Sequence, residues 1–242
     1  MHWSEVFVGE ERALRASVND VTVLIGYGPP GPGPGLVSRA TSLSRELRSQ
    51  VRALRWCEQV HGRVSAALAD EVDRPLEGAA CVGRCDGLLT DARGLGLLVW
   101  TADCVPVILF GGGVVAAVHA GWRGCVADVA PSVVRRFEVE YGVPAAELGA
   151  VLGPAIGPCH YPVGGQVIDG LGALRTGGAT WIDGDRVDLR AFLRCRLQVT
   201  GIDPDRIVSV GPCTFCDPEL ASFRRDGERA GRQFSAVFRG SR

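Results

Sequence analysis

The chain has 242 residues, enough to bury a full hydrophobic core as one large domain or two small ones. Its formal net charge of −1 provides no bulk field that would attract nucleic acid or an anionic membrane surface. All 26 basic residues are arginine, which excludes Schiff-base lysine chemistry and the lysine of a phosphate-binding P-loop.

The first part of the chain predicts a strand, a loop and a helix. Residues 21–28 (VTVLIGYG) alternate in hydrophobicity and end in glycine, as a strand does. Residues 29–35 (PPGPGPG) are predicted to form a loop, because proline lacks a backbone donor and glycine resists ordering. Residues 42–54 carry apolar side chains at helical spacing opposite a polar face, so we predict a helix there.

The rest of the chain mixes strands with helices, and three consecutive glycines at 111–113 predict a tight turn between two of the strands. Asp188 is the predicted N-cap of a late helix. The predicted strands are 54–62, 85–90, 94–110, 112–121, 149–158 and 206–211, and the predicted helices are 125–141 and 188–201. Strands and helices without strict alternation indicate an α+β fold, or a mixed α/β sheet system, and we expect residues 1–242 to form one domain.

Targeting signals are not expected in this sequence. The first 20 residues carry acids throughout and have no apolar core segment, unlike a signal peptide. The longest apolar run, residues 105–118, contains three glycines and falls short of the roughly 18 residues that a membrane helix needs. We therefore expect a cytoplasmic protein, in which the nine cysteines are reduced thiols or metal ligands.

Three strand-like runs end in a residue that can bind a metal, followed by a glycine or a turn. These residues are His61 in QVHG, Cys104 in TADC and His119 in VHAGWRG. Two imidazoles and one thiolate form a zinc set with an open fourth position, which is typical of catalytic zinc and can acidify water or polarise a leaving group. The same trio also fits a Cys–His nucleophile pair without metal, or buried residues with a structural role.

The remaining cysteines suggest a second arrangement. Cys81 and Cys85 could join Cys213 and Cys216 in a four-thiolate zinc knot. Near the C-terminus, residues 224–227 (RRDG) and Arg232 form a basic cluster that fits either a solvated turn or a phosphate contact.

Six sequence blocks lie between Gln59 and Phe238 and resemble one known family. They are QVHG, CDGLLT, TADCVPVIL, AAVHAGWRG, LGPAIGPCHYPVG and CTFCDPELASFRRDGERAGRQFSAVF. Together they resemble the laccase-domain family, whose members were first called polyphenol oxidases and are now read as metal-dependent purine nucleoside phosphorylases of the YfiH type. The resemblance implies an α+β fold in which mixed β-sheets pack together, with flanking helices, in a single domain.

The resemblance also implies an activity and a set of ligands. The family's metal ligands correspond to His61, Cys104 and His119, with Zn2+ as the usual metal and Cu2+ as the alternative. The family's activity is phosphorolysis of adenosine, inosine, guanosine or methylthioadenosine to base and ribose 1-phosphate, with adenosine deamination as well. The expected partners are therefore purine nucleosides and phosphate, without nucleic acid or membrane, for a monomer or weak homo-oligomer.

Other residues gain expected roles in this setting. Cys104 and His119 would be catalytic as well as metal ligands, and Asp103 could orient a ligand imidazole or take a proton. Arg123 could bind phosphate through its planar guanidinium, and His160 is a further candidate for substrate binding.

Two departures from the family pattern keep other functions open. Pro162 stands where the family has an acid, and residues 26–48 replace the family's glycine-rich loop and its later Asn-Arg. The alternatives are a copper-dependent polyphenol oxidase, a degenerate member that binds a nucleotide or a partner without turnover, and a hydrolase using Cys104 and His119. The four histidines of the chain are few for a multicopper site.

Overall fold

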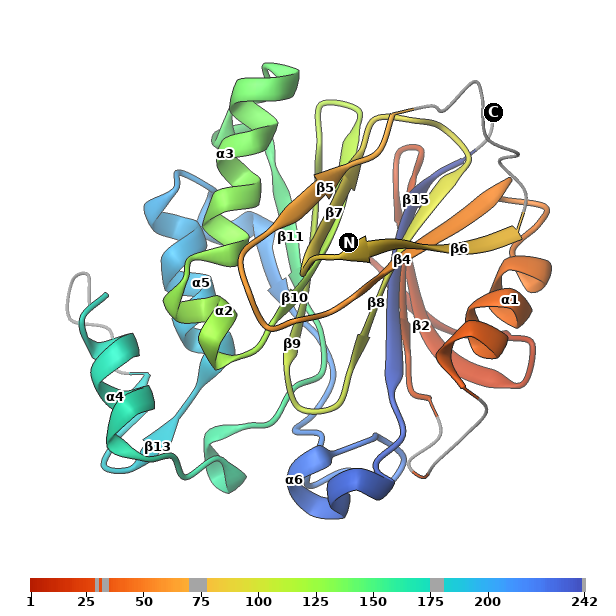
Figure 1. Ribbon diagram of the computed structural model, residues 1–242. Coiled ribbons are helices and arrows are strands. Elements are labelled where there is room, and N and C mark those ends of the chain that lie inside the picture. Colours follow the sequence, from red (N-terminus) through yellow and green to blue (C-terminus); the bar gives the residue numbers. More distant parts are fainter. Residues whose placement is uncertain (29–30, 32–34, 70–77, 175–180, 241–242) are drawn as a thin grey trace.

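Two mixed β-sheets lie face to face at the centre of the molecule (Figure 1). The computed structural model describes residues 1–28, 31, 35–69, 78–174 and 181–240, so most of the loop expected at 29–35 lies outside the described residues. In sheet order, the seven-stranded sheet contains β1 (Trp3–Val8), β2 (Glu11–Val18), β3 (Val21–Gly26), β15 (Gln233–Arg239), β8 (Leu95–Thr101), β4 (Ala53–Glu58) and β6 (Gly78–Arg84).

The second sheet has six strands and carries the hairpin predicted from the three glycines. In sheet order it contains β14 (Ile207–Ser209), β11 (Gly149–Leu152), β9 (Val105–Gly111), β10 (Val114–Ala120), β7 (Gly87–Thr90) and β5 (Ser65–Ala67). Gly112 and Gly113 take positive φ angles of 54° and 80° at the β9–β10 turn, where a side chain would be strained. A separate small sheet pairs β12 (Ile182–Asp183) with β13 (Arg186–Val187).

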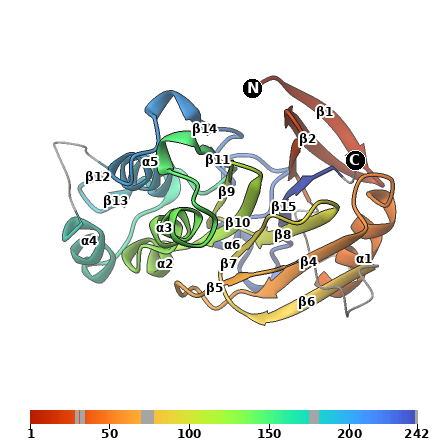
Figure 2. The ribbon, with the colours of Figure 1, turned by 90° about the horizontal axis from the view of Figure 1, so that it is seen from above.

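Helices cover the outer faces of the two large sheets (Figure 2). The longer ones are α1 (Leu36–Glu46), α3 (Val129–Tyr141), α4 (Gly165–Gly172) and α5 (Leu189–Val199); the shorter ones are α2 (Trp122–Val126), α6 (Phe223–Asp226), η1 (Ala145–Glu147), η2 (Pro158–His160), η3 (Pro204–Arg206) and η4 (Gly227–Arg229). Helix α1 packs on the seven-stranded sheet, whereas α2, α3 and α5 lie beside the six-stranded sheet.

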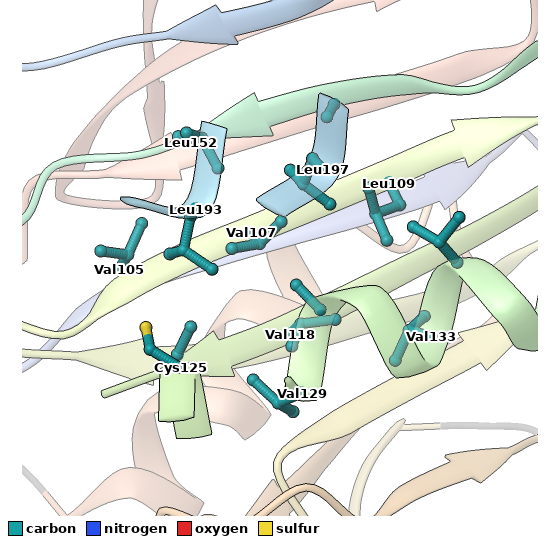
Figure 3. Packing of buried hydrophobic residues seen from close by; sticks show 14 of the residues in the cluster. Val105, Val107, Leu109, Val118, Cys125, Val129, Val133, Leu152, Leu193 and Leu197 are labelled. Carbon is teal, nitrogen blue, oxygen red and sulfur yellow. The ribbon is translucent and has the colours of Figure 1, made fainter. Parts of the chain in front are cut away.

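Clusters of buried apolar residues hold these layers together. Figure 3 shows the outer cluster of the six-stranded sheet, where Val107 and Val118 face Val133 of α3 and Leu197 of α5. The cluster between the sheets joins residues such as Leu97 and Val99 of β8 to Val115 and Ala117 of β10. The predicted α+β architecture of packed mixed sheets with flanking helices is therefore confirmed.

Two predicted helices differ from the observed ones. The helix predicted at 42–54 is wrong in its bounds, because α1 ends at Glu46 and strand β4 already begins at Ala53. Leu43, Leu47, Val51 and Leu54 are all buried, but Leu47 and Val51 lie in the connection after α1 and Leu54 lies in β4, so the helical spacing arose across an element boundary. The helix predicted at 125–141 is divided at Asp128, whose φ of 57° separates α2 from α3.

Seven of the described strands were not predicted from the sequence: β1, β2, β5, β6, β12, β13 and β15. Of these, β1 and β2 form one edge of the seven-stranded sheet, and β15 lies at its centre between β3 and β8. In the described part of the chain, no helix is both long enough and apolar enough to span a membrane.

Candidate active site

The strand ends bring His61, Cys104 and His119 together, where the two sheets meet. His61 follows β4, Cys104 connects β8 to β9, and His119 lies near the end of β10. Because His119 pairs with Pro106 in the β9–β10 ladder, the thiol two residues before Pro106 is held beside the imidazole. The ligand atoms of the three side chains lie within 4.8 Å of one another, and the two imidazole rings meet edge to face with 4.8 Å between centroids.

A fully buried carboxylate, Asp86, fixes both histidines. Its Oδ1 accepts a hydrogen bond from His119 Nδ1 at 2.9 Å and from the backbone N–H of His61 at 2.9 Å. Its Oδ2 accepts from the N–H of Gly62 at 2.7 Å. Burial alone would raise the pKa of Asp86, but the hydrogen bonds from His119, Gly62 and His61 outweigh it and lower the pKa, so the carboxyl is ionised. Asp86 thereby leaves Nε2 of His119 free to face Cys104.

The glycine after β10 makes room for the cluster. A Cβ atom at Gly121 would lie 2.9 Å from Cys104 Sγ and 3.0 Å from His61 Cδ2, closer than packed atoms tolerate. The sequence GWRG behind His119 therefore places a residue without a side chain against the thiol and the imidazole.

The pKa values of Cys104 and His119 shift toward the thiolate and the imidazolium. Burial opposes the charge on each group, but hydrogen bonds and charge pairing with His119 and His61 lower the pKa of Cys104 to about 6. Hydrogen bonds to Asp86 and Cys104 likewise outweigh burial and raise the pKa of His119 to about 9. A thiolate beside a histidine is ready either to bind a metal, releasing the imidazolium proton, or to act as a nucleophile.

Asp103 occupies a different position from the one expected for it. Its φ of 84° is a strained backbone conformation, and its carboxylate accepts a hydrogen bond from Thr214 Oγ1 at 2.6 Å and from the N–H of Arg224 at 2.7 Å. The carboxylate that contacts a ligand imidazole is Asp86. Asp103 instead holds the segment 214–224 against the site, and a role for it in proton transfer stays a prediction.

A pocket of about 610 Å³ opens over the cluster. Arg123, Arg224 and Arg232 contribute guanidinium groups to its wall, and Tyr161 contributes a phenol. The remaining lining residues are Leu36, Trp56, Cys57, Glu58, Gln59, Trp100, Thr101, Ala102, Asp103, Trp122, Ile156, Leu189 and Phe223. A pocket of about 810 Å³ beside α1 is larger, but it has no histidine or cysteine in its lining, so the chemistry favours the smaller one.

Of the two residues predicted to bind substrate, Arg123 lines the pocket and His160 does not. Arg123 is exposed at the pocket wall, where its guanidinium lies 4.4 Å from the ring centroid of Trp122. His160 does not line this pocket; its ring stacks on Phe215 with 4.1 Å between centroids.

The four-thiolate arrangement of Cys81, Cys85, Cys213 and Cys216 is not formed. Cys85 is buried and interacts with Cys57, while Cys213 and Cys216 lie near Cys159. Cys81 lies in β6 of the seven-stranded sheet and Cys85 follows that strand, whereas Cys213 and Cys216 follow β14 of the six-stranded sheet. All nine cysteines are free thiols.

Sequence reasoning missed Asp86, Arg224 and Tyr161 as site residues. Asp86 directly precedes β7 in the block CDGLLT, where a polar residue before a buried strand was the available signal. The sequence shows Arg224 only as part of a basic cluster, and nothing in it places Tyr161 beside the metal-binding trio.

The donor set fits a metal ion. Two imidazoles and a thiolate are ordinary zinc ligands, Asp86 supplies the carboxylate partner that such histidines usually have, and Gly121 leaves space beside the sulfur. Three protein ligands facing a pocket leave one position for a small molecule. The fold and the site thus define a two-sheet α+β protein with an open Cys–His₂ centre, the arrangement of a metal-dependent enzyme.

Comparison with known proteins agrees with this class. Residues 36–240 match the family described as multi-copper polyphenol oxidoreductase laccase, and the chain belongs to this family. It is 39% identical to a purine nucleoside phosphorylase of Mycobacterium tuberculosis over 191 residues, which cover 76% of this chain and 71% of the relative. It is 32% identical over 192 residues to an adenosine deaminase from an unknown prokaryotic organism, covering 73% and 68%.

Solved structures give the same result for the fold. The chain aligns with YfiH of Bacillus licheniformis with a TM-score of 0.78 and 27% identity, covering 90% of this chain and 92% of that one. It aligns with YlmD of Geobacillus stearothermophilus with a TM-score of 0.78 and 26% identity, covering 94% and 96%.

Proposed function

We propose that this protein is a metal-dependent purine nucleoside phosphorylase with adenosine deamination as a side activity. The observation that carries the proposal is the cluster of His61, Cys104 and His119 at the wall of a pocket that also holds three arginines. Relatives named as purine nucleoside phosphorylases and as an adenosine deaminase support the same assignment. We further propose that residues 1–242 act as a single domain, as a monomer or weak homo-oligomer.

The arginines suit the phosphate. In phosphorolysis a phosphate oxygen forms a bond to C1′ of the ribose while the bond from C1′ to the purine nitrogen breaks. The purine leaves with the electron pair of that bond and then takes up a proton. Arg123, Arg224 and Arg232 can bind the dianion and hold one of its oxygens toward the sugar, since guanidinium groups form paired hydrogen bonds with phosphate.

The aromatic lining suits the purine. Trp122, Tyr161 and Phe223 offer flat apolar faces against which a base can stack. Burial raises the pKa of Tyr161, so at neutral pH its hydroxyl is protonated and can donate a hydrogen bond to the leaving base or to the ribose.

We propose Zn2+ as the metal, with Cu2+ as the alternative, held by His61, Cys104 and His119. When bound, the ion would supply a Lewis acid that stabilises negative charge in the pocket. The work of the protein is to keep this centre in place: Asp86 fixes the ring of His119 and the turn that carries His61.

The lowered pKa of Cys104 beside His119 favours one competing function, a hydrolase with Cys104 as the nucleophile. The two functions respond in opposite ways to metal removal. Treatment with a chelator would leave a cysteine hydrolase active, whereas it abolishes the activity of a metal-dependent phosphorylase.

The test is product analysis after incubation with adenosine. Purified protein is incubated with and without inorganic phosphate, and every product is identified by chromatography. The matched variants are His119→Ala, which removes a ligand, and His2→Ala, which removes an exposed histidine at the N-terminus. We expect adenine and ribose 1-phosphate only when phosphate is present, from the wild type and His2→Ala but not from His119→Ala.

Each other outcome assigns a different function. Inosine without adenine would make the protein a deaminase, and oxidation of a phenol by copper-loaded protein would restore the oxidase alternative. No product from metal-loaded protein would contradict the enzymatic function for this substrate and favour a binding protein.

A further inference from the structure

A second cluster of ligand-forming side chains lies outside the pocket. It consists of Cys159, His160, Cys213 and Cys216, whose ligand atoms all lie within 4.8 Å of one another. Cys159 Sγ is 3.6 Å from Cys216 Sγ, and Cys216 Sγ is 3.2 Å from His160 Nδ1. Nothing in the proposed phosphorolysis uses these four side chains.

The distances match a tetrahedral zinc site. With Zn–S bonds of about 2.3 Å, two sulfurs of a tetrahedron lie about 3.8 Å apart, and a sulfur and a nitrogen lie slightly closer. The observed separations of 3.6 and 3.2 Å lie within a few tenths of an ångström of these values, and all four ligand atoms lie within 4.8 Å of one another. Three thiolates and one imidazole are a usual set for structural zinc, and they fill all four positions. We propose that Cys159, His160, Cys213 and Cys216 bind a structural zinc ion.

The backbone around the cluster is arranged for thiolates. The N–H of Gly157 donates to Cys213 Sγ at 3.1 Å, and the turn after Cys213 closes with hydrogen bonds from the N–H groups of Cys216 and Asp217 to the Cys213 carbonyl. The segment CTFC thus has the form of a turn that presents two sulfurs to one point.

Neighbouring groups hold the other two ligands. The ring of His160 stacks on Phe215 with an angle of 13° between the ring planes, which fixes the direction of Nδ1 toward Cys216. Gly157 has no side chain where one would crowd the sulfurs: a Cβ there would lie 3.3 Å from Cys159 Sγ. The carbonyl of Cys159 accepts a hydrogen bond from Arg186 at 2.5 Å, which ties η2 to β13.

The location gives the ion a function. It would join the segment that precedes Tyr161 to the segment that leads to Arg224, and both of these residues line the pocket. Arg224 also donates to the carbonyl of Pro162 at 3.0 Å, so the two segments already touch on the pocket side. A zinc ion would fix this wall of the pocket from behind, without contacting the substrate.

Metal stoichiometry tests the proposal. Protein purified under reducing conditions in the presence of zinc, then freed of excess metal, is measured by mass spectrometry of zinc per chain. We expect about two zinc ions in the wild type and about one in Cys216→Ser, in Cys159→Ser and in His119→Ala, which retains the four-residue site. Cys81→Ser removes an exposed cysteine outside both sites and retains the wild-type value.

Cobalt substitution separates the two sites even if a variant folds poorly. A site with three thiolates gives strong sulfur-to-cobalt charge-transfer absorption, whereas the pocket site has one thiolate. We expect the strong bands in His119→Ala and their loss in Cys216→Ser. The single variant His160→Cys, which provides four thiolates, should show stronger bands than the wild type. A failure of the phosphorylase assay would leave this result unaffected, since the readout does not depend on activity.

Three results would overturn the proposal. One is about one zinc ion in the wild type, with no change in Cys216→Ser. Another is a cobalt spectrum that His119→Ala abolishes. The third uses zinc-loaded protein handled without a reductant. A thiol titration that finds Cys159 and Cys216 oxidised to a disulfide in this sample would show that no zinc protects them.

Discussion

Asp86 is the residue on which the geometry of the metal-binding trio depends. It is fully buried, and its carboxylate contacts the side chain of His119 and the backbone N–H of His61. Asp86 precedes β7, whereas His61 follows β4 and His119 lies in β10. A carboxylate in this position selects the tautomer of His119 and leaves Nε2 for the metal.

Replacement of this carboxylate is expected to weaken metal binding. Asp86→Asn should lower zinc affinity by about 10- to 100-fold, because the amide no longer holds the His119 ring with a charge-assisted hydrogen bond. Competition with a chromophoric chelator measures the affinity, and urea unfolding of the same sample shows whether the fold is retained. Asp183→Asn, at an exposed position of β12, is the control. Equal affinities for both variants would contradict the role of Asp86.

A single methyl group at Gly121 tests whether the metal-binding trio needs the space that this glycine leaves. Gly121→Ala is expected to prevent the thiol and the imidazole from approaching one metal, because the new Cβ would lie 2.9 Å from Cys104 Sγ. Gly164→Ala is the matched control: both glycines precede a helix in extended conformation, with φ of −79° and −81°, but Gly164 has open space around it. Zinc content should fall in the first variant alone, and equal zinc content in both would refute the steric argument.

Element boundaries show how far local sequence signals reach. The cap at Asp188 was predicted and is confirmed, since its Oδ1 accepts from the N–H of Ala191 at 2.9 Å. The end of α1 and the central strand β15 were not predicted, because both depend on which residues the sheets bury. In β15, Phe234 and Phe238 are buried against α1, and the polar residue Ser235 is buried as well. The strand therefore lacks the alternation of polar and apolar residues that would have marked it in the sequence.

Loss of the Asp188 cap has a predictable cost. Asp188→Ala should lower the free energy of unfolding by about 1 kcal/mol, because the first turn of α5 loses its side-chain acceptor. Asp188→Asn retains an acceptor oxygen and should lie close to the wild type. Urea unfolding monitored by circular dichroism measures both variants, and an equal loss in the two would show that charge rather than capping stabilises the helix.

The turn between β2 and β3 is tied to the end of β15 by a titratable ion pair. Burial opposes the charge on Asp20, but hydrogen bonding and charge interaction with Arg239, together with the charge of Arg93, outweigh it and lower the pKa of Asp20. A lowered pKa in the folded state stabilises the protein above the unfolded pKa of about 3.9, and this stabilisation is lost as the pH falls through the folded value.

This linkage gives a pH-dependent difference between two proteins. Asp20→Asn should unfold at lower urea concentration than the wild type at pH 7, with the gap shrinking as the pH falls below about 4. Unfolding curves at both pH values provide the measurement. A gap that stays constant down to acidic pH would mean that the carboxylate charge contributes nothing.

Across the molecule, the sequence predicts the centre of the pocket better than its surroundings. His61, Cys104 and His119 could be found because each follows a recognisable strand, and strand ends converge where sheets meet. The cluster of Cys159, His160, Cys213 and Cys216 could not, since its two halves are brought together only when β11 and the segment after β14 pack side by side.

We propose that the centre formed by His61, Cys104 and His119 supports the cleavage of purine nucleosides by phosphate. Phosphorus NMR of zinc-loaded protein with inosine and inorganic phosphate tests it most directly, since it observes the phosphate itself. We expect a ribose 1-phosphate signal to grow as inorganic phosphate declines, chelation to stop the reaction and added zinc to restore it. An unchanged phosphate signal while inosine is consumed, or turnover that survives complete metal removal, would contradict it.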